Sequence, residues 1–337
     1  MGRTRMPAEW APHERTVICW PCREEIYPGA LMDEARDAHA ELARAIARFE
    51  PVSMIAPPGQ GAAAAEACGG AIEVVELPID DSWFRDSGPI YAFDGDQRVA
   101  LDFTFNGWGE KFAPWDADAA VAAAWAAHAG HPARTIPLVF EGGSITVDGE
   151  GTGATTVQCL LHPNRNPSLT MTEIEDAVCD ALGLHALLWL PYGLALDDDT
   201  DGHVDNVAAF ARPGVLLVQG CDDPTEDDFV RMDVNRRVAE GHVDARGERI
   251  ETVEVPVLPF AELDGERVAV PYLNYYVGNG FVLVPTCGHP ADDDMVALIA
   301  EQFPGREAFG LEIGSILAVG GGGIHCVTQQ VPALPSA

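Results

Sequence analysis

The sequence predicts an α/β fold made of repeated strand-and-helix units. Short apolar runs with the length of buried strands alternate with helical segments along the 337 residues. Five polar loops adjoin apolar runs, and their markers lie 55, 62, 71 and 52 positions apart: Asp86, Glu141, His203, Asn274 and Cys326. Units at loosely similar spacing that each present a polar loop predict internal repetition around one centre.

Hydrophobic periodicity gives the individual elements. Apolar residues recur every three or four positions between Leu31 and Phe49, so we expect an amphipathic helix there. Thr170 and Glu173 have the spacing of a helix capping box. The other expected helices are 62–67, 117–128, 171–182, 226–240 and 292–303, and the expected strands include 16–20, 52–55, 72–77, 215–218 and 281–284.

The composition is globular with a large excess of acidic residues. Asp and Glu number 53 against 20 Lys and Arg, so the formal net charge is −33. Such a chain repels phosphate backbones and anionic lipid headgroups, which argues against nucleic acid and membranes as partners and favours small cationic molecules. Solvation in a salty cytoplasm would explain the acidity equally well.

The chain shows neither a secretory signal at its start nor a segment long enough to cross a membrane. We therefore expect a cytoplasmic protein, for which a homodimer is one possible assembly. The eight cysteines are scattered along the chain, which predicts free thiols rather than a disulfide framework.

The glycine-rich stretch 320–323 leads into Ile324, His325 and Cys326. Glycine lets the backbone approach a bound group closely, and Gly322 is the position at which we expect such an approach. Cysteine attacks as its thiolate. The stretch predicts a covalent thiol site, although a buried cysteine beside a glycine-rich turn would give the same pattern.

If the five loops converge, the site contains a thiol, an imidazole, carboxylates and amides, with Arg85 as its basic residue. Asp86, Asp205 and Glu141 are acceptors when ionised, and facing carboxylates match a planar cation with N–H donors around its rim. A guanidinium fits this description. Attack by the thiol of Cys326 on the guanidinium carbon would release ammonia, and water would then hydrolyse the S-amidino intermediate.

One histidine can act as acid in the first step and as base in the second. His325 adjoins Cys326, but neighbours in an extended segment point to opposite faces, so we expect His325 to face away from the substrate. His203 is the preferred candidate, with Asp205 on the same face. The histidine loop also permits another interpretation, because 197–202 matches the first half of a calcium loop; its twelfth position is Ala208 instead of Glu.

Six motifs occur in the order typical of one known family and cover the chain from about residue 7 to 332. They are 83–89, 105–109, 141–144, 164–167, 200–206 and 321–332. Through them the chain resembles the agmatine deiminases, guanidine-modifying enzymes related to the bacterial-type peptidylarginine deiminases. The resemblance implies one domain over 7–332 with the pentein fold, a five-bladed pseudo-symmetric α/β propeller whose active site lies at the central axis.

The resemblance also implies an activity and the residues that perform it. The activity is hydrolysis of agmatine to N-carbamoylputrescine and ammonia, without metal or cofactor, in polyamine biosynthesis. Cys326 corresponds to the nucleophile, His203 to the acid and base, Asp86 and Asp205 to the guanidinium-binding pair, and Glu141 to a carboxylate that orients the histidine. The further substrate-binding residues implied are Trp83, Trp108, Asn274, Asn279 and Gly322.

Some positions depart from the family pattern. Thr146 stands where a histidine is usual, and Gly323 stands where an asparagine precedes the Ile-His-Cys sequence. These positions bear on recognition of the far end of the substrate, so free or peptidyl arginine remains the alternative substrate. A catalytically silent protein that binds polyamines or calcium is the alternative outside enzymes.

Overall fold

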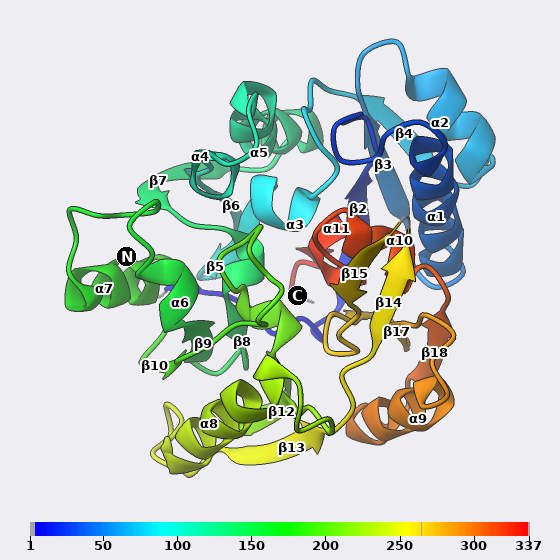
Figure 1. Cartoon of the computed structure of the whole chain (residues 1–337). Coiled ribbons are helices and arrows are strands. Elements are labelled where there is room, and N and C mark those ends of the chain that lie inside the picture. The colour runs from blue at the N-terminus through cyan, green and yellow to red at the C-terminus, as the bar shows by residue number, and fades with distance from the viewer. Residues whose placement is uncertain (1–3, 264, 336–337) are drawn as a thin grey trace.

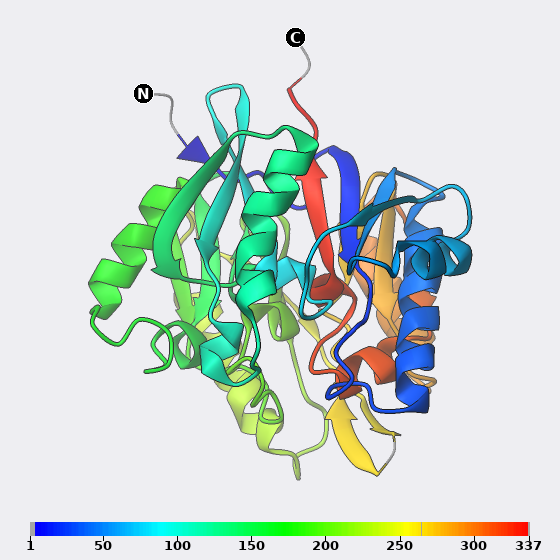
Figure 2. The same cartoon turned by 90° about the horizontal axis from the view of Figure 1, so that it is seen from above.

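The computed structural model describes residues 4–263 and 265–335 and shows a mixed α/β fold (Figures 1 and 2). One pattern of strands and helices occurs five times in this part of the chain. An antiparallel strand pair is followed by a helix, and the chain then returns as a strand parallel to the second member of the pair. A parallel return needs a long crossover, and the helix supplies it.

The helices and strands of the five units lie in the following ranges. The first unit holds β19 (Thr328–Pro332), β2 (His13–Cys19), α1 (Ala30–Ile46) and β3 (Val52–Ala56), and α2 (Gly61–Cys68) and β4 (Glu73–Glu76) extend it. The second holds β5 (Ile90–Asp94), β6 (Gln97–Thr104), α4 (Gly107–Glu110), α5 (Asp116–Ala129) and β7 (Ala133–Val139), with β1 (Thr4–Arg5) on its edge. The third holds β8 (Thr146–Val147), β9 (Thr152–Thr156), α6 (Val157–Leu160), α7 (Met171–Leu182) and β10 (Ala186–Leu190). The fourth holds β11 (Ala208–Arg212), β12 (Val215–Gln219), α8 (Asp227–Gly241) and β13 (Glu251–Val255), and the fifth holds β16 (Tyr276–Gly278), β17 (Phe281–Pro285), α9 (Asp292–Gln302) and β18 (Glu307–Leu311).

The remaining elements lie between the units. Four are short helical turns that precede the first strand of a unit: α3 (Phe84–Ser87), η1 (Gly142–Ser144), η2 (Val204–Asn206) and α11 (Ile324–Val327). The others are the hairpin of β14 (Phe260–Leu263) and β15 (Glu266–Ala269), and α10 (Gly314–Val319). Figure 1 shows α1, α7, α8 and α9 toward the outside of the molecule and α3 and α11 near its middle. Figure 2 shows β2 and β19 between α1 and α7, which lie at opposite edges.

The periodicity predicted the long helices well. The helix expected over 31–49 ends three residues earlier, and the other five expected helices agree with α2, α5, α7, α8 and α9 to within one residue at each end. The capping box is confirmed, because the Thr170 hydroxyl accepts a hydrogen bond from the Glu173 backbone N–H at 3.3 Å while the Glu173 carboxylate accepts one from the Thr170 N–H at 2.8 Å. Among the described residues, no helix is long and apolar enough to cross a membrane.

The segment around Cys326 contradicts the prediction that it is extended. Residues 324–327 form the helical turn α11, in which the side chains of His325 and Cys326 both lie beside Asp205 Oδ2. One side chain from a distant segment and one from the next residue satisfy the ends of this turn. Asn274 Oδ1 accepts from His325 N at 2.9 Å, and the Thr328 hydroxyl donates to the carbonyl of Ile324 at 2.9 Å. Long-range hydrogen bonds thus determine the local conformation.

Replacing Thr328 tests how much this closure stabilises the turn. Thr328 is fully buried, and Thr328→Val keeps the shape of the side chain while removing the hydroxyl that donates to the buried carbonyl of Ile324. We expect the free energy of unfolding, measured by urea denaturation, to fall by about 1–3 kcal/mol. Thr328→Ser keeps the hydroxyl and should lose clearly less. Equal losses for the two variants would contradict the assigned role.

Candidate active site

The loops that precede the first strands of the units bring the predicted residues together. Asp86 lies on α3, Glu141 directly before η1, Asp205 on η2, Asn274 before β16 and Cys326 on α11. All of these side chains are buried, as is His203 directly before η2. A cluster of buried ionisable groups from distant segments is typical of a functional site.

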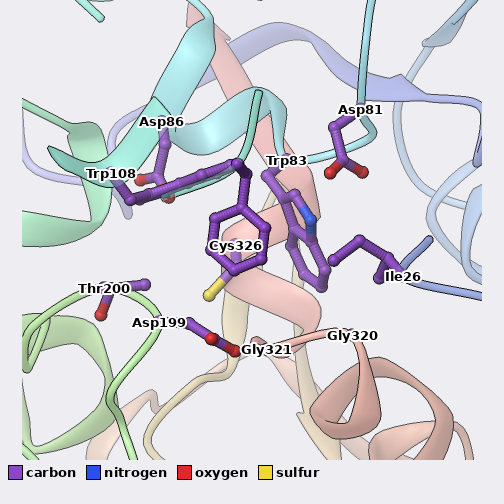
Figure 3. Close-up of a pocket in the computed structure, with 11 residues that line it drawn as sticks. Ile26, Asp81, Trp83, Asp86, Trp108, Asp199, Thr200, Gly320, Gly321 and Cys326 are labelled. Atoms are coloured by element: carbon purple, nitrogen blue, oxygen red, sulfur yellow. Dashed lines mark hydrogen bonds between the residues drawn. The ribbon is translucent and has the colours of Figure 1, made fainter. Parts of the chain in front are cut away.

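A cavity lies beside this cluster (Figure 3). Figure 3 shows side chains from several segments around a common space, with the indoles of Trp83 and Trp108 in its wall and the sulfur of Cys326 exposed to it. The lining residues are Ile26, Asp81, Trp83, Asp86, Trp108, Phe112, Asp199, Thr200, Gly320, Gly321 and Cys326. The cavity therefore combines aromatic surfaces, carboxylates and one thiol.

The thiol of Cys326 is held by an amide and a carboxylate. Asn274 Nδ2 donates to Sγ at 3.1 Å, and Sγ lies 3.4 Å from Asp205 Oδ2. Gly322 leaves room for the sulfur, because a Cβ at that position would lie 3.0 Å from Sγ and 2.7 Å from the Trp83 ring. Asn274 and Gly322 thus position the thiol.

Both carboxylate oxygens of Asp86 accept hydrogen bonds. Oδ1 accepts from Gly143 N at 2.8 Å and Oδ2 from Trp108 Nε1 at 2.9 Å. Gly143 marks the point where the groups converge, since a Cβ there would lie 2.5 Å from His203 Nδ1, 2.9 Å from Asp86 Oδ1 and 3.0 Å from Asp205 Oδ2. Glycine is therefore required at this position, and Trp108 orients Asp86 in addition to lining the cavity.

His203 lies between two carboxylates. Its Nδ1 is 3.8 Å from Asp86 Oδ2 and its Nε2 is 3.9 Å from Glu141 Oε2. Burial alone would lower the pKa of His203, but the charge of Asp86 and contacts with Cys159 and Glu141 raise it well above its usual value. The imidazole is therefore protonated near neutral pH and can act as an acid.

Glu141 is held by an arginine that the site prediction does not include. Arg165 Nε pairs with Glu141 Oε1 at 2.6 Å, and both side chains are fully buried. Burial would raise the pKa of Glu141, but Arg165 and His203 lower it below its usual value. Arg165 belongs to the sequence motif 164–167, but its position in the chain does not show which carboxylate it pairs with.

The segment of His325 is not extended as predicted, but His325 itself does not line the cavity. Its Nδ1 is 2.9 Å from Asp205 Oδ2, and its Nε2 is 2.7 Å from Glu9 Oε1. Arg85 Nη1 is 3.3 Å from the same Glu9 oxygen. Burial by itself would raise the pKa of Glu9, but the charges of His325 and Arg85 lower it to about 2. The N-terminal segment thus contributes to the charge balance of the site.

Asn279 does not lie at this cavity, which corrects its assignment as a pocket residue. It follows β16, where its amide donates to the His13 carbonyl at 2.8 Å and its oxygen accepts from His13 N at 2.9 Å. Its backbone N–H donates to Glu50 at 2.7 Å. The turn between β16 and β17 is thus hydrogen-bonded to β2, and Asn274 alone of the two asparagines contacts the thiol.

The loop that resembles a calcium site uses its carboxylates for internal hydrogen bonds. Asp197 accepts from the Thr200 hydroxyl at 2.7 Å, from His203 N at 3.1 Å and from Asn206 Nδ2 at 3.2 Å. Asp201 pairs with Lys111 at 2.6 Å and with Arg165 at 2.9 Å. These carboxylates hold the loop that presents His203, and their cationic partners oppose binding of a calcium ion.

One group of residues in the described chain has the spacing of metal ligands, namely Glu141, Cys159 and His203, whose donor atoms lie within 4.8 Å of one another. Arg165 already pairs with Glu141. A divalent cation beside this guanidinium would meet strong repulsion, so the set does not fit a metal site.

The two aspartates facing the thiol differ in their proton affinity. For Asp86, burial and the charge of Asp205 raise the pKa, against the opposing charge of His203. For Asp205, burial is outweighed by the hydrogen bond to His325 and by the charges of both histidines, so its pKa is lowered. Burial and the charges of Asp205 and Asp86 raise the pKa of the Cys326 thiol well above its usual value. A cation bound between these groups would instead favour the thiolate.

Comparison with known proteins places this site in a family. The model of the Porphyromonas-type peptidyl-arginine deiminases matches residues 5–332. The chain belongs to this family. Family members similar to it include a Streptomyces coelicolor protein, 44% identical over 97% of this chain and 98% of its own length, and the agmatine deiminase of Pseudomonas aeruginosa, 39% identical over 98% and 95%.

Solved structures of family members have the same fold. The agmatine deiminase of Enterococcus faecalis superposes with a TM-score of 0.93 at 29% identity, over 98% of this chain and 96% of its own. More distantly, the DDAH of Pseudomonas aeruginosa shares the fold with a TM-score of 0.52 at 12% identity, over 95% of this chain and 99% of that one. The mixed α/β fold is thus shared with the agmatine deiminase of Enterococcus faecalis and, more distantly, with the DDAH of Pseudomonas aeruginosa.

The charge around Cys326 predicts how this thiol reacts with alkylating agents. Because its pKa is raised, the neutral reagent iodoacetamide should label Cys326 slowly at pH 7, with a rate that rises up to and beyond pH 9. The cationic reagent 2-chloroacetamidine should label it at least about tenfold faster at pH 7, because the aspartates attract the amidinium and its charge favours the thiolate. Peptide mass spectrometry measures both rates.

Cys179, which is half-buried on α7, is the control thiol for this comparison. It should show no comparable preference for the cationic reagent. Rapid labelling of Cys326 by iodoacetamide at pH 7 would contradict the predicted thiol pKa, and equal selectivity at Cys179 and Cys326 would contradict the electrostatic explanation.

Proposed function

We propose that this chain hydrolyses agmatine to N-carbamoylputrescine and ammonia through a covalent intermediate on Cys326. The main support is that the thiol of Cys326 lies 3.4 Å from Asp205 and lines a cavity with Asp86, which contacts the buried His203. Relatives named agmatine deiminase, 36–39% identical over nearly the whole chain, support the substrate. The chain would then be a hydrolase of guanidino C–N bonds in the biosynthesis of putrescine.

Substrate binding would place the planar guanidinium between the two aspartates. Asp86 and Asp205 would accept its N–H groups, and the added positive charge would lower the pKa of the Cys326 thiol. The thiol would release its proton to solvent as the guanidinium binds, and the thiolate would then attack the guanidinium carbon, forming a C–S bond as the C=N electrons move onto nitrogen. The result is a tetrahedral adduct that the same carboxylates hold.

His203 would transfer the protons in both halves of the reaction. In the first half its protonated ring gives a proton to the departing nitrogen, the C–N bond breaks and ammonia leaves an S-amidino cysteine. In the second half the neutral ring takes a proton from water, which attacks the same carbon. The C–S bond then breaks to return the thiolate, and the remaining hydroxyl proton passes to solvent as the product C=O forms. Glu141, paired with Arg165, would hold the ring in place for both transfers.

The lining of the cavity supports an amine at the far end of the substrate. Its described lining residues include the carboxylates Asp81 and Asp199 and no Lys or Arg. Arg23 Nε pairs with Asp81 at 2.8 Å, so Asp199, which is exposed, is the carboxylate left for a cationic tail. The α-carboxylate of free arginine would need a basic partner, which the described lining does not offer. Free or peptidyl arginine is therefore the second candidate, after agmatine.

We further propose that the five units form a five-bladed pseudo-symmetric propeller, one domain over 7–332, with the site at its central axis. The repeated strand pattern and the polar loop before the first strand of each unit support this arrangement. The cytoplasmic location, the possible homodimer and a reaction that requires neither metal nor cofactor stay predictions. The same holds for binding roles of Trp83, Trp108 and Gly322.

The reaction itself is tested with purified protein and agmatine. We expect ammonia and N-carbamoylputrescine in equal amounts, and Cys326→Ala should abolish turnover while leaving the folded state intact, as followed by circular dichroism. If wild-type protein releases ammonia only from arginine or arginyl peptides, the second candidate replaces agmatine. If no guanidino compound reacts, the proposal is wrong.

A substitution of Asp199 tests recognition of the amine end of agmatine. Asp199→Asn should raise the KM for agmatine about fivefold with little change in kcat, because it removes one ion pair distant from the reacting carbon. The neighbouring Asp198→Asn is the matched control, since Asp198 is exposed but does not line the cavity and should leave KM unchanged. Equal effects of the two variants would show that general charge, rather than a contact at Asp199, determines KM.

A further inference from the structure

We propose that Cys159 is a positioning residue for His203: its buried thiol fixes the imidazole against Glu141 in the orientation that proton transfer requires. Cys159 lies on α6, outside the cavity lining, and the chemistry described above does not use it. The inference rests on the proposed function, in which His203 is the acid and base.

The first observation is that His203 has no hydrogen bond to hold its ring. The side chain is fully buried, and neither ring nitrogen has a hydrogen-bond partner among the described residues. The nearest carboxylate oxygens are 3.8 and 3.9 Å away. A buried imidazole without hydrogen bonds must be oriented by packing and by longer-range polar contacts. The thiol of Cys159 supplies such a contact, because the donor atoms of Cys159, Glu141 and His203 lie within 4.8 Å of one another.

The second observation is that α6 is fastened to the loop that carries His203. Cys159 N donates to Thr156 Oγ1 at 3.1 Å, and the same hydroxyl donates to the carbonyl of Gly202 at 2.6 Å. One threonine therefore connects the backbone at Cys159 to the residue directly before His203. Gln158, the neighbour of Cys159, accepts from Gly193 N at 3.2 Å and joins the two segments again. These hydrogen bonds hold the backbone that carries the thiol close to the loop that carries the imidazole.

The chemistry of a thiol suits this position. Burial raises the pKa of Cys159, so the group is neutral and adds no charge beside the Glu141 and Arg165 pair. A neutral thiol is a weak donor and a weak acceptor, and it can contact both an imidazolium and a carboxylate. A neutral sulfur can accept weakly from the protonated ring but has less to offer the neutral ring, so the thiol favours the imidazolium, as does the nearby Asp86.

A purely structural role is the competing explanation, because Cys159 also belongs to an apolar cluster with Leu160, Ile145 and Val178. A structural cysteine would affect the folded fraction of the protein and leave the proton affinity of His203 unchanged. The two explanations therefore differ in their effect on pH dependence.

The experiment compares Cys159→Ala, Cys159→Ser and the control Cys179→Ala in the full-length protein. For Cys159→Ala we expect kcat on agmatine to fall about tenfold, a part of the 10²–10⁴-fold that a positioned acid–base group contributes, with KM unchanged. The alkaline limb of the pH profile should move to lower pH, because without the thiol His203 loses its proton more easily. Cys159→Ser retains a polar group and should recover part of kcat, and Cys179→Ala should behave as wild type.

A second readout does not depend on turnover. An NMR titration of the His203 ring without substrate should show a lower pKa in Cys159→Ala than in wild type. An unchanged His203 titration, or a loss of kcat that only follows the loss of folded protein, would overturn the proposal. If wild-type protein fails to hydrolyse agmatine, the proposed function fails, whereas the titration still tests the contact between Cys159 and His203.

Discussion

The structure depends on the balance of charge around two buried aspartates. Asp86 and Asp205 are buried carboxylates beside a thiol, and such an arrangement costs free energy unless cations compensate it. His203 compensates Asp86, and His325 compensates Asp205. The compensation is close to complete for Asp205, whose pKa is lowered, and incomplete for Asp86, whose pKa is raised. The remaining deficit of positive charge is what a guanidinium would fill.

This balance explains why residues far from the cavity matter. Glu9 and Arg85 fix His325, and Arg165 fixes Glu141, so both of these groups are backed by a partner of opposite charge. Asp201 forms ion pairs with both Arg165 and Lys111. Because Lys111 directly follows α4, the second pair connects the histidine loop to the end of α4. Acidic and basic side chains alternate along this network, and their contacts hold loops that are far apart in the sequence in one arrangement.

The repeated strand pattern provides the rigid frame for this network. In each unit the polar loop directly precedes the first strand, so a side chain at the loop is held by a buried sheet at one end and by hydrogen bonds to a neighbouring loop at the other. Gly143 and Gly322 then allow the loops to approach more closely than any side chain would permit. A site of this kind depends on close packing, because a single Cβ would separate its members.

The sequence by itself determined the long helices, the five polar loops and the residue types at the centre. Periodicity and the capping box at Thr170 are local signals, and the acid residues, histidine and cysteine were readable because their chemistry points to a planar cation. Only the tertiary structure decided the conformation at Cys326, the position of His325, the partners of Glu141 and the exclusion of Asn279. The reason is physical: a four-residue turn is too short to have a conformation of its own, so long-range hydrogen bonds from Asn274 determine it. Which carboxylate a buried arginine meets depends likewise on how segments far apart in the chain pack.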